Sequence, residues 1–307
     1  MRRLSSLLLS YGFLVIFSCS DGDVIDFEFD FDDTFVACGE VDLLLYKTKE
    51  DPSETVSVLI SSYTLDDIFE EDPDNDSLVI PKPNVRFTYR TYDRPDLPKD
   101  LFCSSVPPEG LNIVVDQNDA TAVATIIRTF TEDDNDGIPA ELENQDPNGD
   151  GDFSDAQDTD NDGIPDYLDQ DDDGDNVLTA NENPDPDGNG DLSDAQDTDG
   201  NGTPDYLDSD DDGDGVLTRD EETDTQDQNP LNDITNSDIG ADYLNPSVTT
   251  STPAMAYKEH SISRTFVVRL VVSDIRIDFL SQDEFDFGIL TGESKLSGST
   301  EITPDFP

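Results

Sequence analysis

Residues 132–222 carry an acidic pattern that repeats every 39 residues. Five acids of one copy recur, in order, in the next: Asp146, Asp158, Asp169, Asp171 and Glu182 become Asp185, Asp197, Asp208, Asp210 and Glu221. Within a copy the acids stand at alternate positions and a glycine follows. A tight loop with that spacing turns several oxygens toward one hard cation. The pattern predicts that this segment binds calcium, with no room for regular helices between its loops.

The charge of the chain is extreme and uneven. The formal net charge is −58, and 35 of the 74 acids fall in the 91 residues of the array, where Arg219 is the only base. Without counter-ions such a segment repels itself and stays extended. The charge also argues against nucleic acid as a partner, because phosphate binding needs basic patches.

The first residues are a targeting signal. Arg2 and Arg3 precede an apolar run over 4–17 that is too short to span a bilayer. Residues 16–19 (Ile-Phe-Ser-Cys) resemble the lipobox of bacterial lipoproteins, which implies cleavage after Ser18 and lipidation of Cys19. The acidic residues 20–23 resemble the tract that directs some Bacteroidetes lipoproteins to the cell surface. The alternative is an ordinary secretory signal with an incidental cysteine.

Two cysteines, Cys38 and Cys103, remain after the signal. An even number of cysteines in an exported chain predicts one disulfide, which would stabilise the fold by about 4 kcal/mol on the chain-entropy model. Two free buried thiols are the alternative. Neither cysteine has a Cys-x-x-Cys partner, so a redox or zinc site is not expected.

The rest of the chain is rich in β-branched and aromatic residues, which predicts strands. Those before the array are expected at 24–31, 41–46, 55–62, 78–80, 85–92, 111–115 and 120–130, with one helical turn at 66–71. Prolines at 52, 81, 83, 107 and 108 are expected to separate them. Those after the array are expected at 263–272, 275–280, 285–290 and 301–303.

These elements predict a mainly β fold, a β-sandwich-like domain with an inserted, helix-poor calcium-binding array. The expected divisions are a signal peptide at 1–18, an N-terminal β part at 19–131, the array at 132–245 and C-terminal strands at 246–307 that complete the β-domain. Four strands alone make a poor domain, which is why we expect them to join the N-terminal sheet. Two separate β-domains joined by the array is the competing layout.

Seven twelve-residue loops of three alternating types fit the array; they begin at residues 132, 146, 158, 171, 185, 197 and 210. The first type resembles an EF-hand loop, whose side-chain ligands stand at positions 1, 3, 5, 9 and 12. In the later two copies we expect as ligands Asp171, Asp173, Asp175, Thr179 and Glu182, and Asp210, Asp212, Asp214, Thr218 and Glu221. The loop beginning at Glu132 supplies Asp134, Asp136 and Glu143, with Ala140 where an acid is usual.

The second loop type has Ile-Pro-Asp-Tyr-Leu or Thr-Pro-Asp-Tyr-Leu inside it and resembles the thrombospondin type 3 repeat. The resemblance covers a third of the chain and implies that ions replace a hydrophobic core and are shared between loops. Its expected ligands are Asp158, Asp160, Asp162, Asp166 and Asp169, and Asp197, Asp199, Asn201, Asp205 and Asp208. The third type supplies Asp146, Asn148 and Asp150, and Asp185, Asp187 and Asn189; it ends in glutamine and is expected to bind more weakly. A disordered acidic linker and a dockerin are the alternatives.

Catalytic signals are missing from the sequence. His260 is the only histidine, and we expect it on the surface or in a loop. No nucleophile elbow, His-Glu-x-x-His motif or P-loop occurs. Phe87, Tyr89 and Tyr92 fall on one expected strand, where aromatic residues indicate sheet packing more than a sugar-binding face. We therefore do not expect an enzyme.

The function expected is that of a calcium-binding lipoprotein with a structural or adhesive role. It would be lipid-anchored to the outer membrane and face the cell surface, with calcium, the membrane and a cell-surface protein or glycan as partners. A glycan- or protein-capture module is the second hypothesis, which a flat aromatic patch would favour. A hydrolase or isomerase with an unrecognised site is the third, which a deep cleft with paired acids would favour.

Overall fold

The computed structural model describes residues 30–72, 75–104, 106, 108–222, 227–278, 284–304 and 306. Contacts divide the chain into Met1–Asp30 and Phe31–Pro307, and the fold described below is that of the second unit. The signal peptide expected at 1–18, the lipidation expected at Cys19 and most of the strand expected at 24–31 lie outside the described residues.

Eight strands and one α-helix make up the described β part, and three strands follow the acidic segment. The elements are β1 (Thr34–Cys38), β2 (Leu43–Lys49), β3 (Glu54–Ile60), α1 (Leu65–Glu70), β4 (Ser77–Tyr92), β5 (Ile113–Asp133), β6 (His260–Ser273), β7 (Glu284–Leu290) and β8 (Ser297–Ile302). The prediction of a mainly β fold with an inserted, helix-poor segment is confirmed. β1 was not expected from the sequence.

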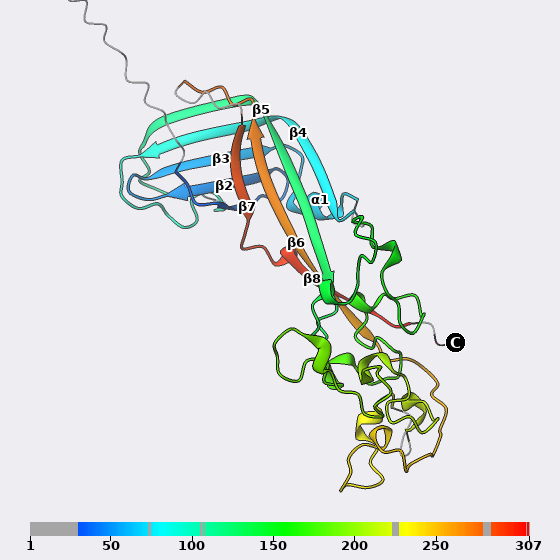
Figure 1. Ribbon diagram of the computed structural model, residues 1–307. Coiled ribbons are helices and arrows are strands. Elements are labelled where there is room, and N and C mark those ends of the chain that lie inside the picture. The colour runs from blue at the N-terminus through cyan, green and yellow to red at the C-terminus, as the bar shows by residue number, and fades with distance from the viewer. Residues whose placement is uncertain are drawn as a thin grey trace, which may run out of the picture. The chain divides into compact units, whose positions relative to one another are not determined.

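Seven of the strands close into one sheet in the order β5-β4-β3-β2-β1-β7-β6, and β6 pairs back to β5 (Figure 1). The closing pairs join the two ends of the chain: β5 lies antiparallel to β6, with Phe130 opposite Phe266, and β1 lies parallel to β7. β8 pairs with the first half of β6, beyond the closed part. Strands from both sides of the acidic segment therefore belong to one sheet.

β4 is one strand of 16 residues, although the sequence predicted a break at its prolines. Pro81 and Pro83 pair with β5 across one edge, whereas β3 pairs with β4 only from Arg86 to Thr91. No described strand pairs with the β3-facing edge of β4 at Pro81 and Pro83, so the absence of their N–H groups costs no hydrogen bond between strands on that edge. A register irregularity follows Pro83, where Asn84 has a φ of 58°.

Two other predicted boundaries differ from the structure. β5 runs without a break from Ile113 to Asp133, so the strands expected at 111–115 and 120–130 are one. The strand expected at 275–280 does not form over its described residues, because β6 ends at Ser273 and Asp274 takes a positive φ of 57°. The helical turn expected at 66–71 is α1, which Thr64 caps through its hydroxyl and the Asp67 N–H.

The core lies inside the closed sheet and includes the aromatic residues of β4. Phe87, Tyr89 and Tyr92 are all buried, so they pack in the sheet and offer no sugar-binding face. Arg128 of β5 is fully buried and donates hydrogen bonds to five backbone carbonyls in and after α1, including that of Asp72 at 2.6 Å. Cys38, at the end of β1, forms a disulfide with Cys103.

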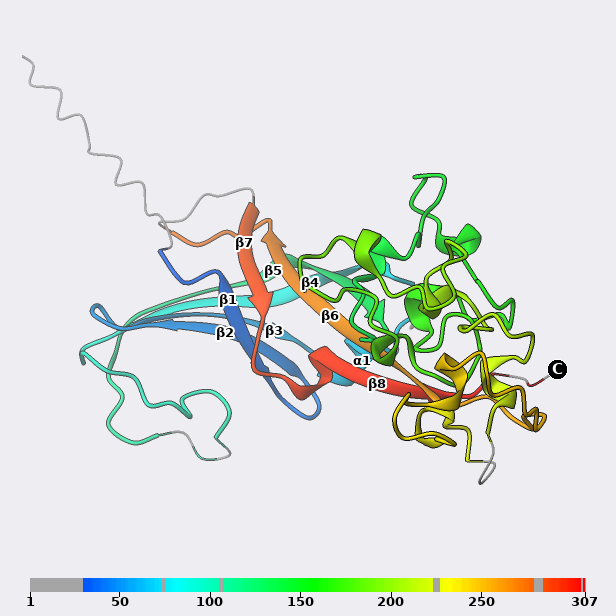
Figure 2. The same ribbon diagram turned by 60° about the horizontal axis from the view of Figure 1, so that its bottom comes forward.

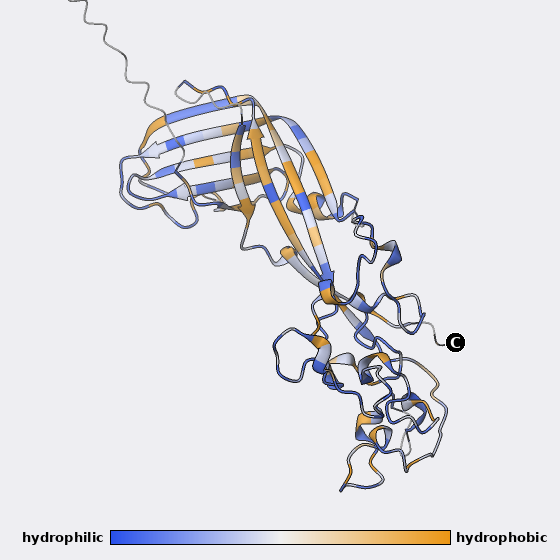
Figure 3. Cartoon of the chain, viewed as in Figure 1, coloured by the Kyte–Doolittle hydropathy of each residue, from blue (hydrophilic) through white to orange (hydrophobic). Residues whose placement is uncertain are grey.

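The acidic segment between β5 and β6 is built from short 3₁₀ turns joined by loops (Figure 2). The turns are η1 (Ala140–Leu142), η2 (Phe153–Asp155), η3 (Asp166–Leu168), η4 (Thr179–Asn181), η5 (Leu192–Asp194), η6 (Asp205–Leu207), η7 (Thr218–Asp220), η8 (Pro230–Asn232) and η9 (Asp242–Leu244); η10 (Ser294–Leu296) precedes β8. Figure 3 shows this segment as mainly hydrophilic, in contrast to the strands. The acidic segment therefore has too few apolar residues to be stabilised by a hydrophobic core like that of the closed sheet.

Candidate metal centres

The 39-residue sequence repeat is also a structural repeat. η1, η4 and η7 begin 39 residues apart, as do η2 and η5, and η3 and η6. In each copy the loop aspartates shape their own backbone: one carboxylate oxygen accepts the N–H two residues ahead. Oδ1 of Asp136 accepts from Ile138 at 2.7 Å, and Oδ1 of Asp175 accepts from Val177 at 2.7 Å. This turn chemistry leaves the second oxygen of each aspartate available for another ligand.

Four carboxylates meet at the first copy of the EF-like loop, in a group that we call cluster 1: Asp134, Asp136, Glu143 and Asp172. One oxygen of each lies within 4.8 Å of the others, and all four side chains are at most 7% exposed. Neither oxygen of Glu143 or of Asp172 receives a hydrogen bond from the described residues. Burial of several carboxylates without donors is costly unless a cation is bound between them.

Cluster 2 repeats this arrangement one copy further on, with Asp173, Asp175, Glu182 and Asp211. These side chains are at most 4% exposed, and both oxygens of Asp173, Glu182 and Asp211 lack a described hydrogen-bond donor. Every ligand atom in the two clusters is an oxygen. Oxygen-only sets suit hard cations and not zinc or copper.

In both clusters the fourth acid comes from the next copy of the repeat. Asp172 closes the loop of Asp134, and Asp211 closes the loop of Asp173. Sequence reasoning missed both, because an EF-hand template assigns ligands only to alternate positions and these acids occupy the second. Their own separation of 39 residues was the signal that was available. The successor of Asp211 in this register is Thr250, so the third copy has no such acid.

Burial is the main reason that the pKa values of these carboxyl groups are raised, and the charges of neighbouring carboxylates raise them further. Together they raise the pKa of Asp134 to about 9 and that of Glu143 to about 10. In cluster 2 the same causes raise the pKa of Asp211 to about 10 and hold the pKa values of Asp173 and Glu182 well above the usual range. Without a cation these carboxyl groups therefore retain protons near neutral pH, and a bound cation would take the place of those protons.

A tyrosine from the copy after next lies beside each cluster. Tyr206 lines a small cavity of about 130 Å³ together with Glu143 and Asp172, and burial plus the charges of those acids raise its pKa to about 12. Burial and the charges of Glu182 and Asp211 likewise raise the pKa of Tyr243. Each cluster is thus assembled from three successive parts of the array. The sequence showed the Asp-Tyr-Leu segments but not this role of the tyrosine.

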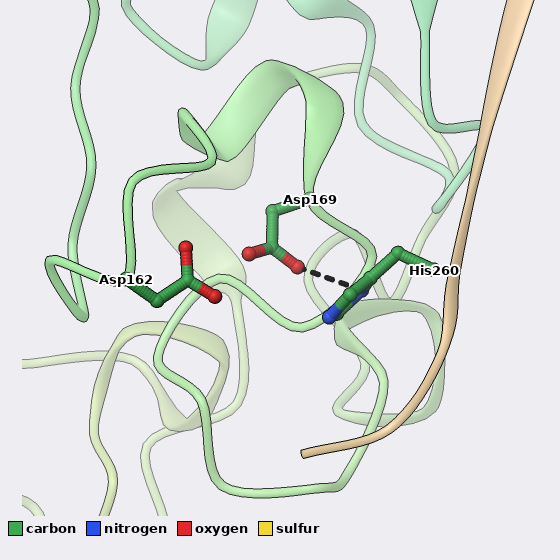
Figure 4. A group of neighbouring side chains, drawn as sticks. All are labelled: Asp162, Asp169 and His260. Carbon is green, nitrogen blue, oxygen red and sulfur yellow. Dashed lines mark ion pairs between the residues drawn. The ribbon is translucent and has the colours of Figure 1, made fainter. Parts of the chain in front are cut away.

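In the loop that begins at Asp158, the carboxylates of Asp158, Asp160 and Asp162 also lie close together. Asp162 also lies close to Asp169 and His260. His260 is 1% exposed, so the expectation of a surface or loop histidine was wrong. Its Nδ1 lies 2.9 Å from Oδ1 of Asp169 (Figure 4). Burial alone would lower the pKa of His260, but the hydrogen bond to Asp169 and nearby carboxylate charges raise it overall.

Asp166 and Asp205, predicted as ligands in the second-type loops, pair with a threonine of their own loop and are not members of cluster 1 or cluster 2. Asp166 accepts hydrogen bonds from the N–H and the hydroxyl of Thr159, at 2.7 and 2.8 Å, and Asp205 does the same with Thr198 at 2.7 Å. Asp242 repeats the clamp with Thr235. These aspartates close their loops through threonine. Thr179 and Thr218, predicted as ligands, accept from the N–H groups of Asp172 and Asp211.

The remaining predicted ligands lie outside the two clusters; most are exposed or half-buried, and Asp171, Asp212 and Glu221 are buried. Both oxygens of Asp146, and both of Asp185, accept N–H groups of their own loops, as do those of Asp171 and Asp197. Asp185 and Asp187 group with Asp194, which was not predicted. Asn148, Asp150, Asn189, Asp199, Asn201 and Asp208 make contacts within or next to their loops. In the third EF-like copy, Asp210, Asp212, Asp214 and Glu221 each keep one buried oxygen without a described donor.

The chain returns along the array before it enters β6. The N–H of Thr252 donates to the Asp220 carbonyl at 2.6 Å, and the N–H of Lys258 donates to Oδ1 of Asn176 at 3.0 Å. Gln170 then joins both closing strands, because its amide donates to the Asp134 carbonyl and accepts from the N–H of Ser261. The array is therefore bound to the closed sheet by hydrogen bonds between array side chains and main-chain groups at or near β5 and β6.

Comparisons with known protein families, with curated proteins and with solved structures found no match to this chain. Within the described residues, no helix has the length and apolar character needed to cross a membrane.

Proposed function

We propose that residues 132–245 bind calcium ions and that bound calcium orders this segment into a rigid insertion between β5 and β6. The observation that carries the proposal is the pair of buried four-carboxylate clusters, in which every acid keeps at least one oxygen without a described hydrogen-bond donor. Calcium accepts six to eight oxygens in flexible geometry, whereas magnesium demands a near-ideal octahedron and retains several waters. A cage built mainly from protein carboxylates therefore favours calcium.

The role that follows is structural. Calcium would do for this segment what apolar burial does for the closed sheet, namely offset the conformational entropy of the ordered chain. Because cluster 1 takes Asp172 and cluster 2 takes Asp211 from the following copy, each ion would tie two copies together. Extracellular calcium modules have dissociation constants of roughly 0.1–1 mM, which suits a protein exposed to millimolar calcium.

Terbium luminescence tests the proposal. Tb³⁺ replaces calcium at oxygen sites and emits when a nearby aromatic ring is excited, and this chain has nine tyrosines and no tryptophan. We expect emission that calcium suppresses by competition. Tyr206→Phe should remove the share from cluster 1 and Tyr243→Phe that from cluster 2. Tyr46→Phe, in the closed sheet, is the control. Emission that is absent, or equally affected by all three changes, would contradict the proposal.

The second part of the proposal is the location, which rests on the sequence alone. Residues 16–19 resemble a lipobox, so we propose that Cys19 carries the lipid that anchors the protein to the outer membrane, facing the cell surface. Radiolabelled palmitate should enter the wild-type protein in a bacterial host and be absent from Cys19→Ser. Label retained in that variant would refute the anchor without affecting the calcium sites.

A further inference from the structure

A cleft of about 670 Å³ lies where the end of β5 meets the first loops of the array. Its walls carry three aromatic rings: Phe130 of β5, Phe153 of η2 and Tyr167 of η3. Phe153 remains 39% exposed and packs edge-on against Tyr167, with the ring centroids 5.9 Å apart. An exposed phenylalanine on the wall of a cleft of this size offers an apolar contact surface for a ligand.

The rim of the cleft is acidic. Glu132, Asp133, Glu141 and Asp152 line it, and none of its described lining residues is a lysine or an arginine. The ligand that this chemistry fits is positively charged and has a flat or apolar body. A cation that combines both is the guanidinium of arginine, which stacks on aromatic rings and forms paired hydrogen bonds with carboxylates.

The chain itself shows how a guanidinium fits beside this cleft. Arg264 of β6 lies 4.2 Å above the ring of Phe130 and contacts Glu132 at 2.6 Å from its Nη2. Phe130 and Glu132 are both cleft residues. Phe130 and Glu132 therefore already combine an aromatic face with a carboxylate around an arginine. Phe153, Asp152 and Glu141 also line the cleft and supply a second aromatic ring and further carboxylates.

The next copy of the repeat shows that the aromatic ring of the cleft is not a general property of the acidic array. The residues that match Asp152-Phe153-Ser154 in the next copy are Asp191-Leu192-Ser193. Both aspartates cap a 3₁₀ turn in the same way, by accepting the N–H of the serine. The second copy thus has the same charge and the same turn but no aromatic ring.

We propose that this cleft binds an arginine side chain from a basic peptide segment of a partner protein. The guanidinium would stack on Phe153 and pair with Asp152 and Glu141. The inference goes beyond calcium binding, although it depends on the proposed function in one respect: η1 and η2 flank the loops that the cations order. The protein would then be one whose calcium-ordered segment presents a peptide-binding cleft.

Fluorescence polarisation tests this with a labelled pentapeptide that contains two arginines, and with its lysine counterpart. The full chain is used at about 1 mM calcium and about 0.15 M salt. We expect saturable binding of the arginine peptide and weaker binding of the lysine peptide. Phe153→Leu, which installs the residue of the second copy, should weaken binding about fivefold, the size of one cation–π contact. Asp152→Asn keeps the turn cap and should weaken binding about threefold.

Asp191→Asn is the matched control, because it removes the same charge from the same turn without touching the cleft. It should leave the affinity unchanged. Absence of saturable binding, equal loss in Asp152→Asn and Asp191→Asn, or equal affinity for the lysine peptide would each overturn the proposal. Terbium emission recorded on the same samples reports the cation sites separately, so the peptide titration decides the cleft whatever the terbium result is.

Discussion

Nδ1 of His260 lies 2.9 Å from Oδ1 of Asp169, a residue 91 positions earlier in the chain. His260 is the first residue of β6, and Asp169 ends an acidic loop of the array. Both side chains are buried. This pair is therefore a side-chain link between the inserted segment and the closed sheet, next to the hydrogen bonds that the Gln170 side chain makes to the main chain of Asp134 and Ser261.

His260→Ala should destabilise the calcium-loaded protein by about 2 kcal/mol, because the buried Asp169 carboxylate then loses its side-chain partner and its Oδ1 keeps only the N–H of Asp171 as a described donor. Urea unfolding followed by circular dichroism measures the free energy. Ser261→Ala, one residue further on, keeps the N–H that bonds Gln170 and should have little effect. If His260→Ala and Asp169→Asn destabilise the protein additively in the double mutant, the two side chains do not act as a pair.

Asp172→Asn should weaken one calcium site of cluster 1 about tenfold or more, because it removes a charged ligand from a buried set. Asp150→Asn should change little, since Asp150 is exposed and its oxygen accepts a backbone N–H that asparagine also accepts. Isothermal calorimetry compares the two variants, which carry the same change of charge. Equal losses would show that total charge, and not the closing carboxylate, sets the affinity.

Asp136 and Asp172, two members of cluster 1, show where sequence reasoning succeeded and where it failed. The 39-residue period and the spacing within each loop predicted the array, its lack of regular helices and six of the eight members of the two clusters, because local spacing sets the loop geometry. It failed for Asp172 and Asp211, whose position depends on how one copy stacks on the next. For Asp166 the spacing predicted a ligand, whereas the structure pairs its carboxylate with Thr159.

The fold shows the same division. Alternation predicted most strands, but their pairing depends on partners far away in the sequence. Pro81 and Pro83 indicated a break, and the strand continues because β3 does not reach that part of β4. His260 gave no local signal at all, since its burial results from Asp169 and the array packing on β6.

The effect of calcium on stability should depend on pH. In cation-free folded protein, burial raises the pKa of Glu143 to about 10 and of Asp134 to about 9, above the value of about 4 in an unfolded chain. The folded state then binds more protons, so its free energy of unfolding falls as pH rises between those values. Calcium takes the place of the protons, and its stabilisation should grow with pH.

The measurement is the thermal midpoint of the calcium-loaded and the dialysed, calcium-free protein at pH 5 and at pH 8. We expect the calcium-induced increase in the midpoint to be larger at pH 8. An increase of the same size at both values would indicate that the buried carboxylates remain ionised without calcium. An increase that is larger at pH 5 would contradict the sign of the linkage.

Hydrogen exchange with mass spectrometry, with and without calcium, tests the central claim most directly, because it reports order for each part of the chain. We expect calcium to slow exchange strongly in peptides covering 134–143, 172–182 and 205–221, while β2 to β4 exchange at the same slow rate in both conditions. Equal exchange of the acidic segment with and without calcium would contradict the claim that cations hold it together.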